Sequence, residues 1–263
     1  MKLPLSVFII TKNEEDRIGN IINLVKDFAD EVLVIDSGSS DSTTDVSTKS
    51  GAKVMFNEWK GYGEQKIFGE KNCKNDWILN IDADEEVSLD LANELKQLFE
   101  SNTLNDKKGY RVNIVNKFRF ENKPNKLAYY YNQLRLYNKN HAGFKDSTVH
   151  DSVSLFEEVG DNEIGQLNNI IYHQSFRSIT HWIEKINSYS QMQALDALAR
   201  DKHSSMIKIL LTPTFAFFKA YFVRRYFIYG FDGLIYSYLF AFSRFAKVIK
   251  IREAHKQKSL PTK

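Results

Sequence analysis

The chain has 263 residues, of which 43% are hydrophobic and 26% are charged. This composition is ordinary for a globular protein with a sizeable core, and it argues against a low-complexity or disordered chain. The single cysteine, Cys73, excludes an intramolecular disulfide and is expected to be a buried thiol. Residues 1–4 lead directly into an apolar segment without a signal-peptide pattern, which predicts a cytoplasmic protein.

The formal net charge of +3 conceals an uneven distribution of charge. Residues 202–263 contain 12 Lys or Arg and 2 Asp or Glu, whereas residues 1–201 contain 24 basic and 31 acidic side chains. A basic C-terminal region of this kind predicts a partner of its own, either nucleic acid or an anionic membrane surface.

The first third of the chain alternates apolar runs with helical patterns. Four strands are predicted, at residues 5–11, 31–35, 52–56 and 78–81. The segments between them begin with polar residues and continue at helical spacing, which predicts three helices. This alternation is typical of βαβ units and predicts an α/β fold, in which ligands bind beyond the carboxyl ends of the strands.

The fourth strand ends in an unusually acidic turn, in which five residues include Asp82, Asp84, Glu85 and Glu86. Because side chains alternate along an extended chain, Asp82 and Asp84 are expected on the same side. Such a pair suits a hard divalent cation shared with a diphosphate. The alternative interpretation of these residues is a capped helix that starts at Glu85. Thr11 and Asp36 end two further strands, and this convergence favours a ligand site.

The middle of the chain is less regular. Strands are predicted at residues 109–115 and 134–137, and helices at 91–99 and 180–198. Residues 116–131 are basic and aromatic, which is compatible with an insertion that faces a ligand and equally with a mobile surface loop.

Residues 213–245 contain fourteen Phe or Tyr side chains interleaved with Lys and Arg. This pattern predicts a helical segment that lies in the interface of an anionic membrane, with a helical cap on the α/β domain as the alternative. Gly230 and Gly233 are expected to divide it into two helices. A polar tail at residues 253–263 is expected to be disordered.

Three motifs carry a resemblance to a known family: IITKNEE at residues 9–15, VIDSGSSD at 34–41 and LNIDADE at 79–85. They resemble the family-two glycosyltransferases of the GT-A fold. The order of the motifs, with GYGEQK at 61–66, LRL at 134–136 and VHD at 149–151, is similar to the bacterial lipopolysaccharide-core glucosyltransferase type.

The resemblance implies three parts: a GT-A catalytic domain at residues 1–200, a helical membrane-associating region at 201–252, and the tail. Residues 202–252 would contact the anionic inner leaflet, so that a cytoplasmic enzyme would be peripherally attached to the inner membrane. No nucleic acid is expected as a partner, because the acidic strand ends would repel phosphates.

The resemblance also implies roles at a nucleotide-sugar site. Thr11 and Glu14 would frame the base, and Asp36 would accept hydrogen bonds from the nucleoside. Lys66 would lie near the diphosphate, although a solvated helix lysine is the alternative interpretation.

The metal and the proton acceptor follow from the same resemblance. Asp84 would hold Mg²⁺ or Mn²⁺, Asp82 would face the metal or the ribose, and His173 is a further possible ligand. Asp151 would be the base that takes the proton of the acceptor hydroxyl, with His150 as its neighbour.

The expected function is therefore an inverting, metal-dependent transfer of a hexose, glucose from UDP-glucose, to a lipopolysaccharide-core or other glycolipid saccharide. The alternatives are a transferase that acts on a protein or a polyprenyl phosphate, a noncatalytic nucleotide-sugar binder, and a nucleic-acid-binding protein. The oligomeric state does not follow from the sequence.

Overall fold

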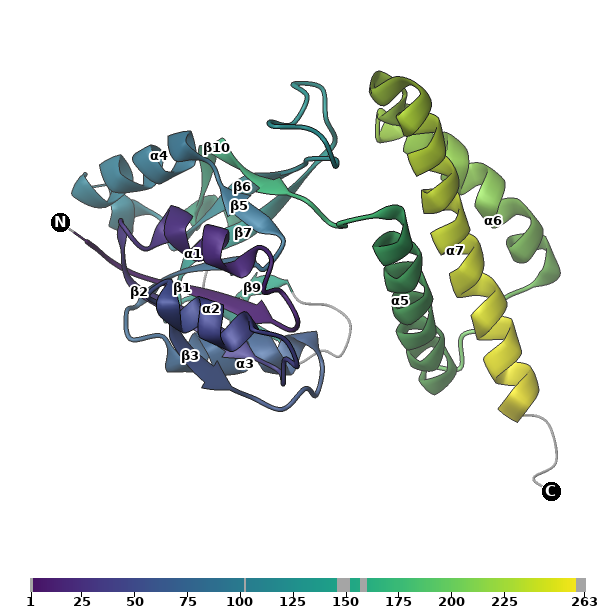
Figure 1. The fold of residues 1–263 in the computed structure, drawn as a ribbon, viewed down its shortest axis with the longest axis horizontal. Coiled ribbons are helices and arrows are strands. Elements are labelled where there is room, and N and C mark those ends of the chain that lie inside the picture. The colour runs from purple at the N-terminus through teal and green to yellow at the C-terminus, as the bar shows by residue number, and fades with distance from the viewer. Residues whose placement is uncertain (1, 102, 146–151, 157–159, 259–263) are drawn as a thin grey trace. The chain divides into compact units, whose positions relative to one another are not determined.

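A computed structural model describes residues 2–101, 103–145, 152–156 and 160–258 (Figure 1). The chain forms two compact units. The sheet unit consists of Met1–Val115 and Tyr130–Gln174, and the helical unit consists of Asn116–Tyr129 and Ser175–Lys263. The two units therefore divide at Gln174, whereas the expected domains meet at residue 200.

The sheet unit contains an eight-stranded sheet with the order β3-β2-β1-β4-β7-β6-β10-β5. Its parallel half consists of β1 (Leu3–Thr11), β2 (Ala29–Asp36), β3 (Lys53–Phe56) and β4 (Trp77–Asp82). The remaining strands are β5 (Glu85–Val87), β6 (Gly109–Asn116), β7 (Tyr130–Asn138) and β10 (Ile164–His173). A separate two-stranded ladder joins β8 (Ala142–Phe144) to β9 (Val153–Leu155).

Helices cover both faces of this sheet, which confirms the predicted α/β class. They are α1 (Ile18–Val25), α2 (Thr43–Lys49), α3 (Tyr62–Asn72) and α4 (Leu89–Glu100). Because side chains alternate along β1, Val7 and Ile9 belong to the core under α1 and α4, whereas Phe8 and Ile10 belong to the core under α3. Both faces of β1 are therefore covered, and its residues are mostly apolar, as in covered parallel strands.

The register of the parallel strands brings the predicted polar residues to one edge. Thr11 at the end of β1 lies beside Asp36 on β2, and the preceding Ile10 lies beside Asp82 on β4. All three strands are parallel, so their carboxyl ends meet there.

The alternative interpretation of Glu85 as the start of a helix is wrong. Glu85–Val87 forms the short strand β5, which pairs antiparallel with β10. Helix α4 begins four residues later at Leu89, and the Ser88 hydroxyl caps it by accepting the Leu91 amide at 3.2 Å.

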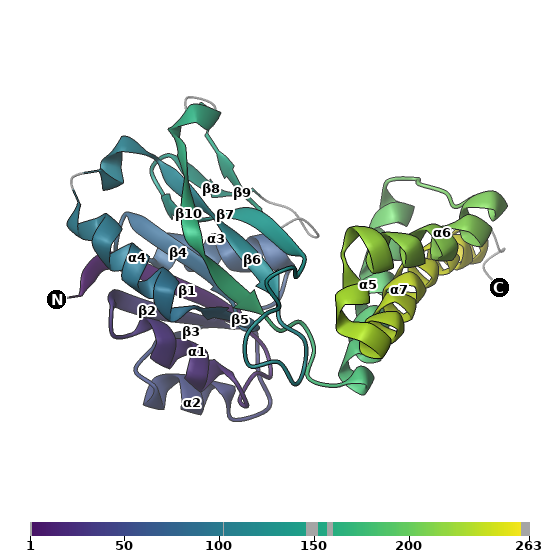
Figure 2. The ribbon, with the colours of Figure 1, turned by 90° about the horizontal axis from the view of Figure 1, so that it is seen from above.

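The helical unit consists mainly of α5 (Ile179–Ala199), α6 (Met206–Phe218) and α7 (Gly230–Lys258), and α7 contacts both other helices (Figure 2). A π-helical turn (η3, Lys219–Val223) and a 3-10 turn (η4, Tyr226–Tyr229) connect α6 to α7. Helix α7 begins at Gly230, as predicted, but Gly233 lies within α7 and not at a break, and α7 extends to Lys258, six residues into the expected tail. At Gly233 a Cβ atom would lie 1.8 Å from the Tyr226 carbonyl oxygen, so only glycine fits there.

An aromatic core holds residues 116–129 to these helices. The Phe118 ring stacks on Tyr236 at 4.3 Å, and Phe176 stacks on Trp182 at 4.0 Å. Phe118 also meets Tyr226 edge to face at 5.3 Å. The basic aromatic segment of the sequence is thus partly a structural element of the helical unit.

Many large apolar side chains of the helical unit nevertheless remain exposed. Among the described residues, one helical stretch, Met206–Val223, is long and apolar enough to cross a membrane by length and composition alone, and only 11% of it is buried. The exposed residues on this stretch and on α7 include Ile207, Leu210, Phe215, Phe222 and Phe231.

The single cysteine provides a test of the sheet unit. Cys73 is buried, and burial raises its pKa to about 12. The thiolate is the reactive form, and a free cysteine is roughly a quarter ionised at pH 8. We expect a thiol reagent at pH 8 to modify the native protein at least about 10³-fold more slowly than the urea-unfolded chain. Rapid modification of the native protein, measured by absorbance, would contradict this burial.

Candidate functional site

Asp36 is fixed in a tight polar turn at the end of β2. Its Oδ2 atom accepts hydrogen bonds from the backbone amides of Gly38 at 2.8 Å and Ser39 at 2.9 Å, and its Oδ1 atom accepts the Ser39 hydroxyl. Gly38 has a φ of 91°, in the region that favours glycine. The VIDSGS motif therefore builds a rigid loop around a buried carboxylate.

Thr11 lies next to this loop. Its carbonyl oxygen accepts both the amide and the hydroxyl of Ser37 at 3.1 Å. Its own hydroxyl is buried and has no hydrogen-bond partner among the described residues. An unpaired buried hydroxyl costs about 1–3 kcal/mol, so a ligand that bonds to Thr11 would recover that cost.

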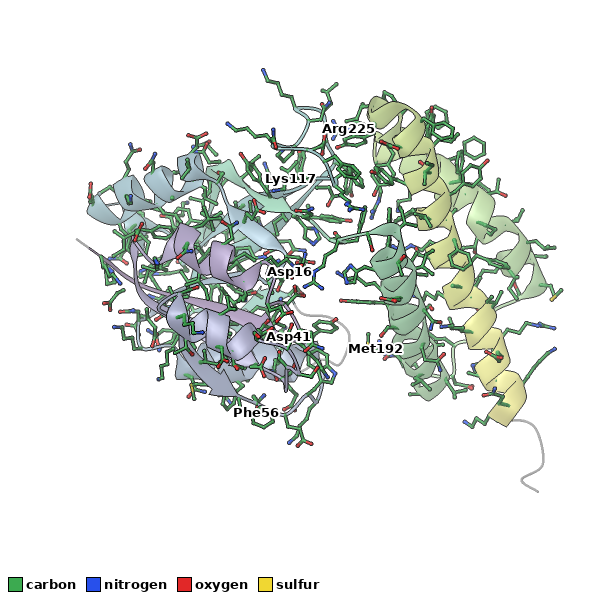
Figure 3. The ribbon with its side chains drawn as sticks, in the orientation of Figure 1. Asp16, Asp41, Phe56, Lys117, Met192 and Arg225 are labelled. Atoms are coloured by element: carbon green, nitrogen blue, oxygen red, sulfur yellow. The ribbon has the colours of Figure 1, made fainter. Side chains whose placement is uncertain are left out.

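Glu14 is held by an ion pair that the sequence did not reveal. The Arg17 Nε atom lies 2.5 Å from the Glu14 carboxylate, and Arg17 Nη1 donates to the Gln174 carbonyl oxygen at 3.0 Å. Burial would lower the pKa of Arg17, but the hydrogen bond and charge of Glu14 outweigh the effect of burial, so the pKa of Arg17 is raised. Nearby, Asp16 and Asp41 lie at the same end of the unit, close to the start of α1 and of α2 (Figure 3).

Asp82, at the end of β4, lies between two cations. The Lys66 ammonium on α3 is 2.9 Å from its Oδ1 atom, and the Arg135 guanidinium on β7 is 3.0 Å from its Oδ2 atom. The Lys66 side chain is fully buried, which excludes the solvated helix lysine of the alternative interpretation.

Arg135 connects Asp82 to a second carboxylate. Its Nη2 atom lies 2.6 Å from Glu85, and its Nη1 atom donates to Asn80 at 2.8 Å. Glu85 in turn accepts the Asp82 amide at 3.0 Å. Two cations and two carboxylates therefore form one network across α3, β4, β5 and β7, in which only Asp82 is partly exposed.

The two carboxylates of this network differ in proton affinity. Burial would raise the pKa of Asp82, but Lys66 and Arg135 outweigh it and hold the pKa well below its usual range. Burial raises the pKa of Glu85, and the opposing effect of Arg135 is not sufficient to reverse the shift. Asp82 is thus a fixed anion, whereas Glu85 is the member more easily protonated.

Asp84 projects toward a different partner. Its Oδ2 atom lies 3.5 Å from Nε2 of His173 at the end of β10, and its carbonyl oxygen accepts the Gln174 amide at 2.9 Å. Pairing of β5 with β10 sets this proximity, since His173 lies opposite Glu85. Both side chains are partly exposed.

The structure thus gathers most of the residues singled out from the sequence at one edge of the sheet. Asp151 and His150 lie outside the described residues. Arg135 and Arg17 were missed as functional candidates. An arginine inside the apolar run LRLY was the available signal for Arg135, because a charged side chain within a strand that is otherwise apolar needs a buried partner.

The network can be tested through Arg135. We expect Arg135→Met to lose about 3–5 kcal/mol of unfolding free energy at pH 7, because it leaves the buried Glu85 without a cation and Asp82 with Lys66 alone. Without Arg135 their folded pKa values rise, so protonation relieves the cost and the deficit should shrink as the pH falls toward 5. Urea unfolding measures both effects. Arg111→Met, at an exposed position of β6, is the control, and an equal loss in the control would contradict the network.

Known proteins resemble this chain along most of its length. A family model described as Glycosyl transferase family 2 matches residues 6–158. An uncharacterized glycosyltransferase of Rickettsia bellii is 46% identical over 253 residues, which cover 95% of this chain and 86% of the relative. The lipopolysaccharide core biosynthesis glycosyltransferase LpsC of Rhizobium meliloti is 29% identical over 276 residues, with 99% and 96% coverage.

Among solved structures, glucosyl-3-phosphoglycerate synthase from Mycobacterium tuberculosis, in complex with Mn²⁺, uridine diphosphate and glucosyl-3-phosphoglycerate, aligns with a TM-score of 0.48. It is 17% identical, and the alignment covers 77% of this chain and 82% of that one. The family resemblance of the sequence motifs is confirmed by the family match: the chain belongs to glycosyl transferase family 2, with a GT-A fold and a C-terminal helical part.

Proposed function

We propose that this protein is an inverting, metal-dependent hexosyltransferase that moves glucose from UDP-glucose to a saccharide of lipopolysaccharide core or a related glycolipid. The observation that carries the proposal is the gathering of Asp36, Asp82 and Asp84 at the carboxyl edge of the sheet, beside the buried Lys66. The similarity to LpsC supports the choice of acceptor.

The donor would lie across the ends of β1, β2 and β4. The Thr11 hydroxyl has unused hydrogen-bonding capacity, and Asp36 is a rigid acceptor for the nucleoside. Glu14 would contribute through the loop that it fixes with Arg17. Each oxygen of Asp82 keeps a second lone pair beyond its ion pair, so it can still accept a ribose hydroxyl.

The residues present fit a divalent cation. A separation of 3.5 Å between Asp84 Oδ2 and His173 Nε2 is close to the spacing of two neighbouring ligands around one ion with bonds of roughly 2.0–2.2 Å. Mn²⁺ accepts such a mixed pair, and Mg²⁺ would depend more on Asp84 and the diphosphate. When bound, the ion would neutralise charge on the departing diphosphate.

The transfer would be a single displacement. The acceptor hydroxyl oxygen forms a bond to the anomeric carbon while the bond from that carbon to the diphosphate oxygen breaks, and the configuration inverts. The hydroxyl proton passes to a carboxylate, for which Asp151 is our candidate, with His150 beside it. Uridine diphosphate leaves with the electron pair of the broken bond.

The helical unit would attach the enzyme to the cytoplasmic face of the inner membrane. Phe215 and Phe218 are exposed on α6 and Phe222 is exposed on η3, and residues 202–263 carry 12 basic against 2 acidic side chains. Aromatic side chains together with basic ones favour the interface of an anionic bilayer.

The direct test is turnover of a panel of nucleotide sugars with membrane extracts as acceptor, with and without Mn²⁺. We expect transfer from UDP-glucose that depends on the metal and is lost on chelation. Transfer that is unaffected by chelation would contradict the metal role, and a preference for another donor would contradict the choice of sugar.

Asp84→Asn is expected to lower kcat by roughly 10²-fold or more, because a bound ion supplies several kcal/mol of charge stabilisation and each 1.36 kcal/mol is a tenfold effect. Asp90→Asn removes an exposed carboxylate in the first turn of α4 and is the matched control. Equal rates for the two variants would exclude Asp84 as a metal ligand.

Membrane attachment is tested by sedimentation with vesicles of phosphatidylglycerol and phosphatidylcholine. The double substitution Phe215→Ser and Phe222→Ser should reduce binding to anionic vesicles by about tenfold or more, since each buried aromatic contributes about 1.5–3 kcal/mol. Phe56→Ser is the control, because Phe56 on β3 is 68% exposed, the same fraction as Phe215 (Figure 3). Salt-sensitive binding to duplex DNA in place of vesicles would favour the nucleic-acid alternative.

A further inference from the structure

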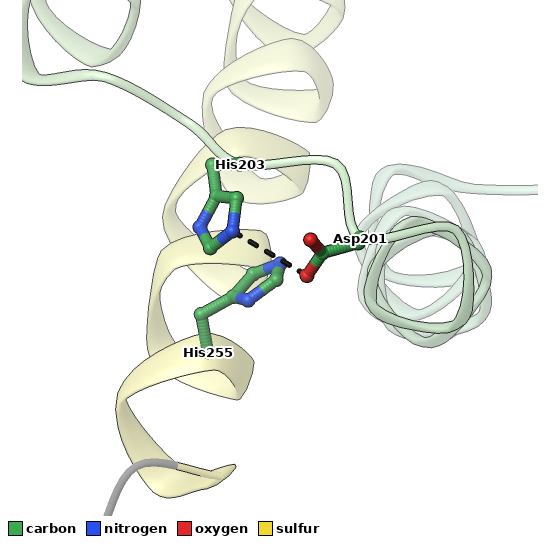
Figure 4. Close-up of side chains that lie close together, drawn as sticks. All are labelled: Asp201, His203 and His255. Carbon is green, nitrogen blue, oxygen red and sulfur yellow. Dashed lines mark ion pairs between the residues drawn. The ribbon is translucent and has the colours of Figure 1, made fainter.

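A cluster of metal-binding side chains lies within the helical unit. Asp201, His203 and His255 each offer one ligand atom, and these atoms all lie within 4.8 Å of one another (Figure 4). The sequence separates His255 from the other two by 52 residues or more, so only the tertiary fold brings them together.

The end of α5 determines where two of these residues lie. The Lys202 amide donates to the Ala197 carbonyl at 2.8 Å, and Asp201 adopts a left-handed backbone conformation with a φ of 53°. This turn ends the helix, and His203 follows in the connection to α6. Asp201 and His203 are thereby presented from one short bend.

Helix α7 supplies the third residue. The Nε2 atom of His255 lies 3.1 Å from the Lys202 carbonyl oxygen, and its ring centroid is 3.8 Å from that of His203. His203 Nε2 lies 3.5 Å from Asp201 Oδ1. Ligand atoms around a tetrahedral ion with bonds of about 2.0–2.2 Å are separated by about 3.3–3.6 Å. Small side-chain rotations would therefore bring all three to one ion.

We propose that Asp201, His203 and His255 bind Zn²⁺ or a similar late first-row divalent ion, which fastens the end of α7 to the α5–α6 connection. Two imidazole nitrogens and one carboxylate select such ions over Mg²⁺ and Ca²⁺, which prefer oxygen ligands. Asp201 and His203 are mostly exposed, so a water molecule can take the fourth position.

Positively charged neighbours limit the affinity of this site for a cation. Lys202 and Lys256 are sequence neighbours of the ligands, and their charge opposes a second cation. We therefore expect weaker Zn²⁺ binding than at a four-ligand structural site, and the fold does not require the ion.

The experiment is calorimetric titration of the full-length protein with Zn²⁺ in excess Mg²⁺. All measurements use protein that carries Asp84→Asn. This substitution removes a ligand of the proposed catalytic metal, so Zn²⁺ binding in the helical unit is measured separately from binding at Asp84. We expect one Zn²⁺ per chain and a rise in melting temperature with Zn²⁺. His203→Gln or His255→Gln in the same background should weaken binding at least tenfold and abolish the thermal shift.

His141→Gln in the sheet unit is the matched control and should bind as the background does. Circular dichroism shows whether the variants fold, and Asp201→Asn provides a further ligand variant. Absence of stoichiometric Zn²⁺ binding in the background would overturn the proposal. Undiminished binding in both histidine variants would overturn it as well. A visible absorption band of tetrahedral Co²⁺, lost in the same variants, would support it.

Discussion

The sheet unit depends on the pairing of two buried cations with one buried and one partly buried carboxylate. Charges taken out of water are costly unless each meets an opposite charge with good hydrogen-bond geometry. Lys66, Arg135, Asp82 and Glu85 meet this condition only if α3, β4, β5 and β7 occupy their observed positions. The network therefore determines how the acidic turn leaves the sheet, and this sets Asp84 against His173 rather than against the buried lysine.

The strand ends could be predicted from the sequence because the prediction needs only two rules, and neither depends on distant contacts. Apolar runs identify covered strands, and parallel strands deliver their carboxyl ends to one edge. The same reasoning could not assign Arg135, whose partners lie 50 or more residues away in the sequence. Strand β5 was also missed, since three residues are too short for a periodic pattern and its pairing with β10 spans a large sequence separation.

The helical unit shows a different limit of prediction from sequence. Composition identified the basic aromatic region, but it did not separate structural aromatics from exposed ones. Phe118 lies about a hundred residues before its partners Tyr226 and Tyr236, and it occupies the centre of their cluster. Phe215 on α6 and Phe222 on η3 have the same residue type and remain exposed, because no element of the described chain covers them. Exposed apolar surface of this extent is typical of a surface that binds a partner.

Charge at the edge of the sheet explains why a divalent cation belongs in the proposed reaction. The positive charges of Lys66 and Arg135 are balanced by Asp82 and Glu85, and Arg17 is balanced by Glu14. Asp84 adds a further negative charge beside His173. A nucleoside diphosphate would therefore meet an edge without net positive charge, in a partly desolvated place where repulsion is weakly screened. Lys66 alone cannot neutralise the diphosphate, because the charge of Lys66 is already paired with Asp82. In the proposed reaction, an ion held by Asp84 would supply the missing positive charge where the leaving diphosphate gains negative charge.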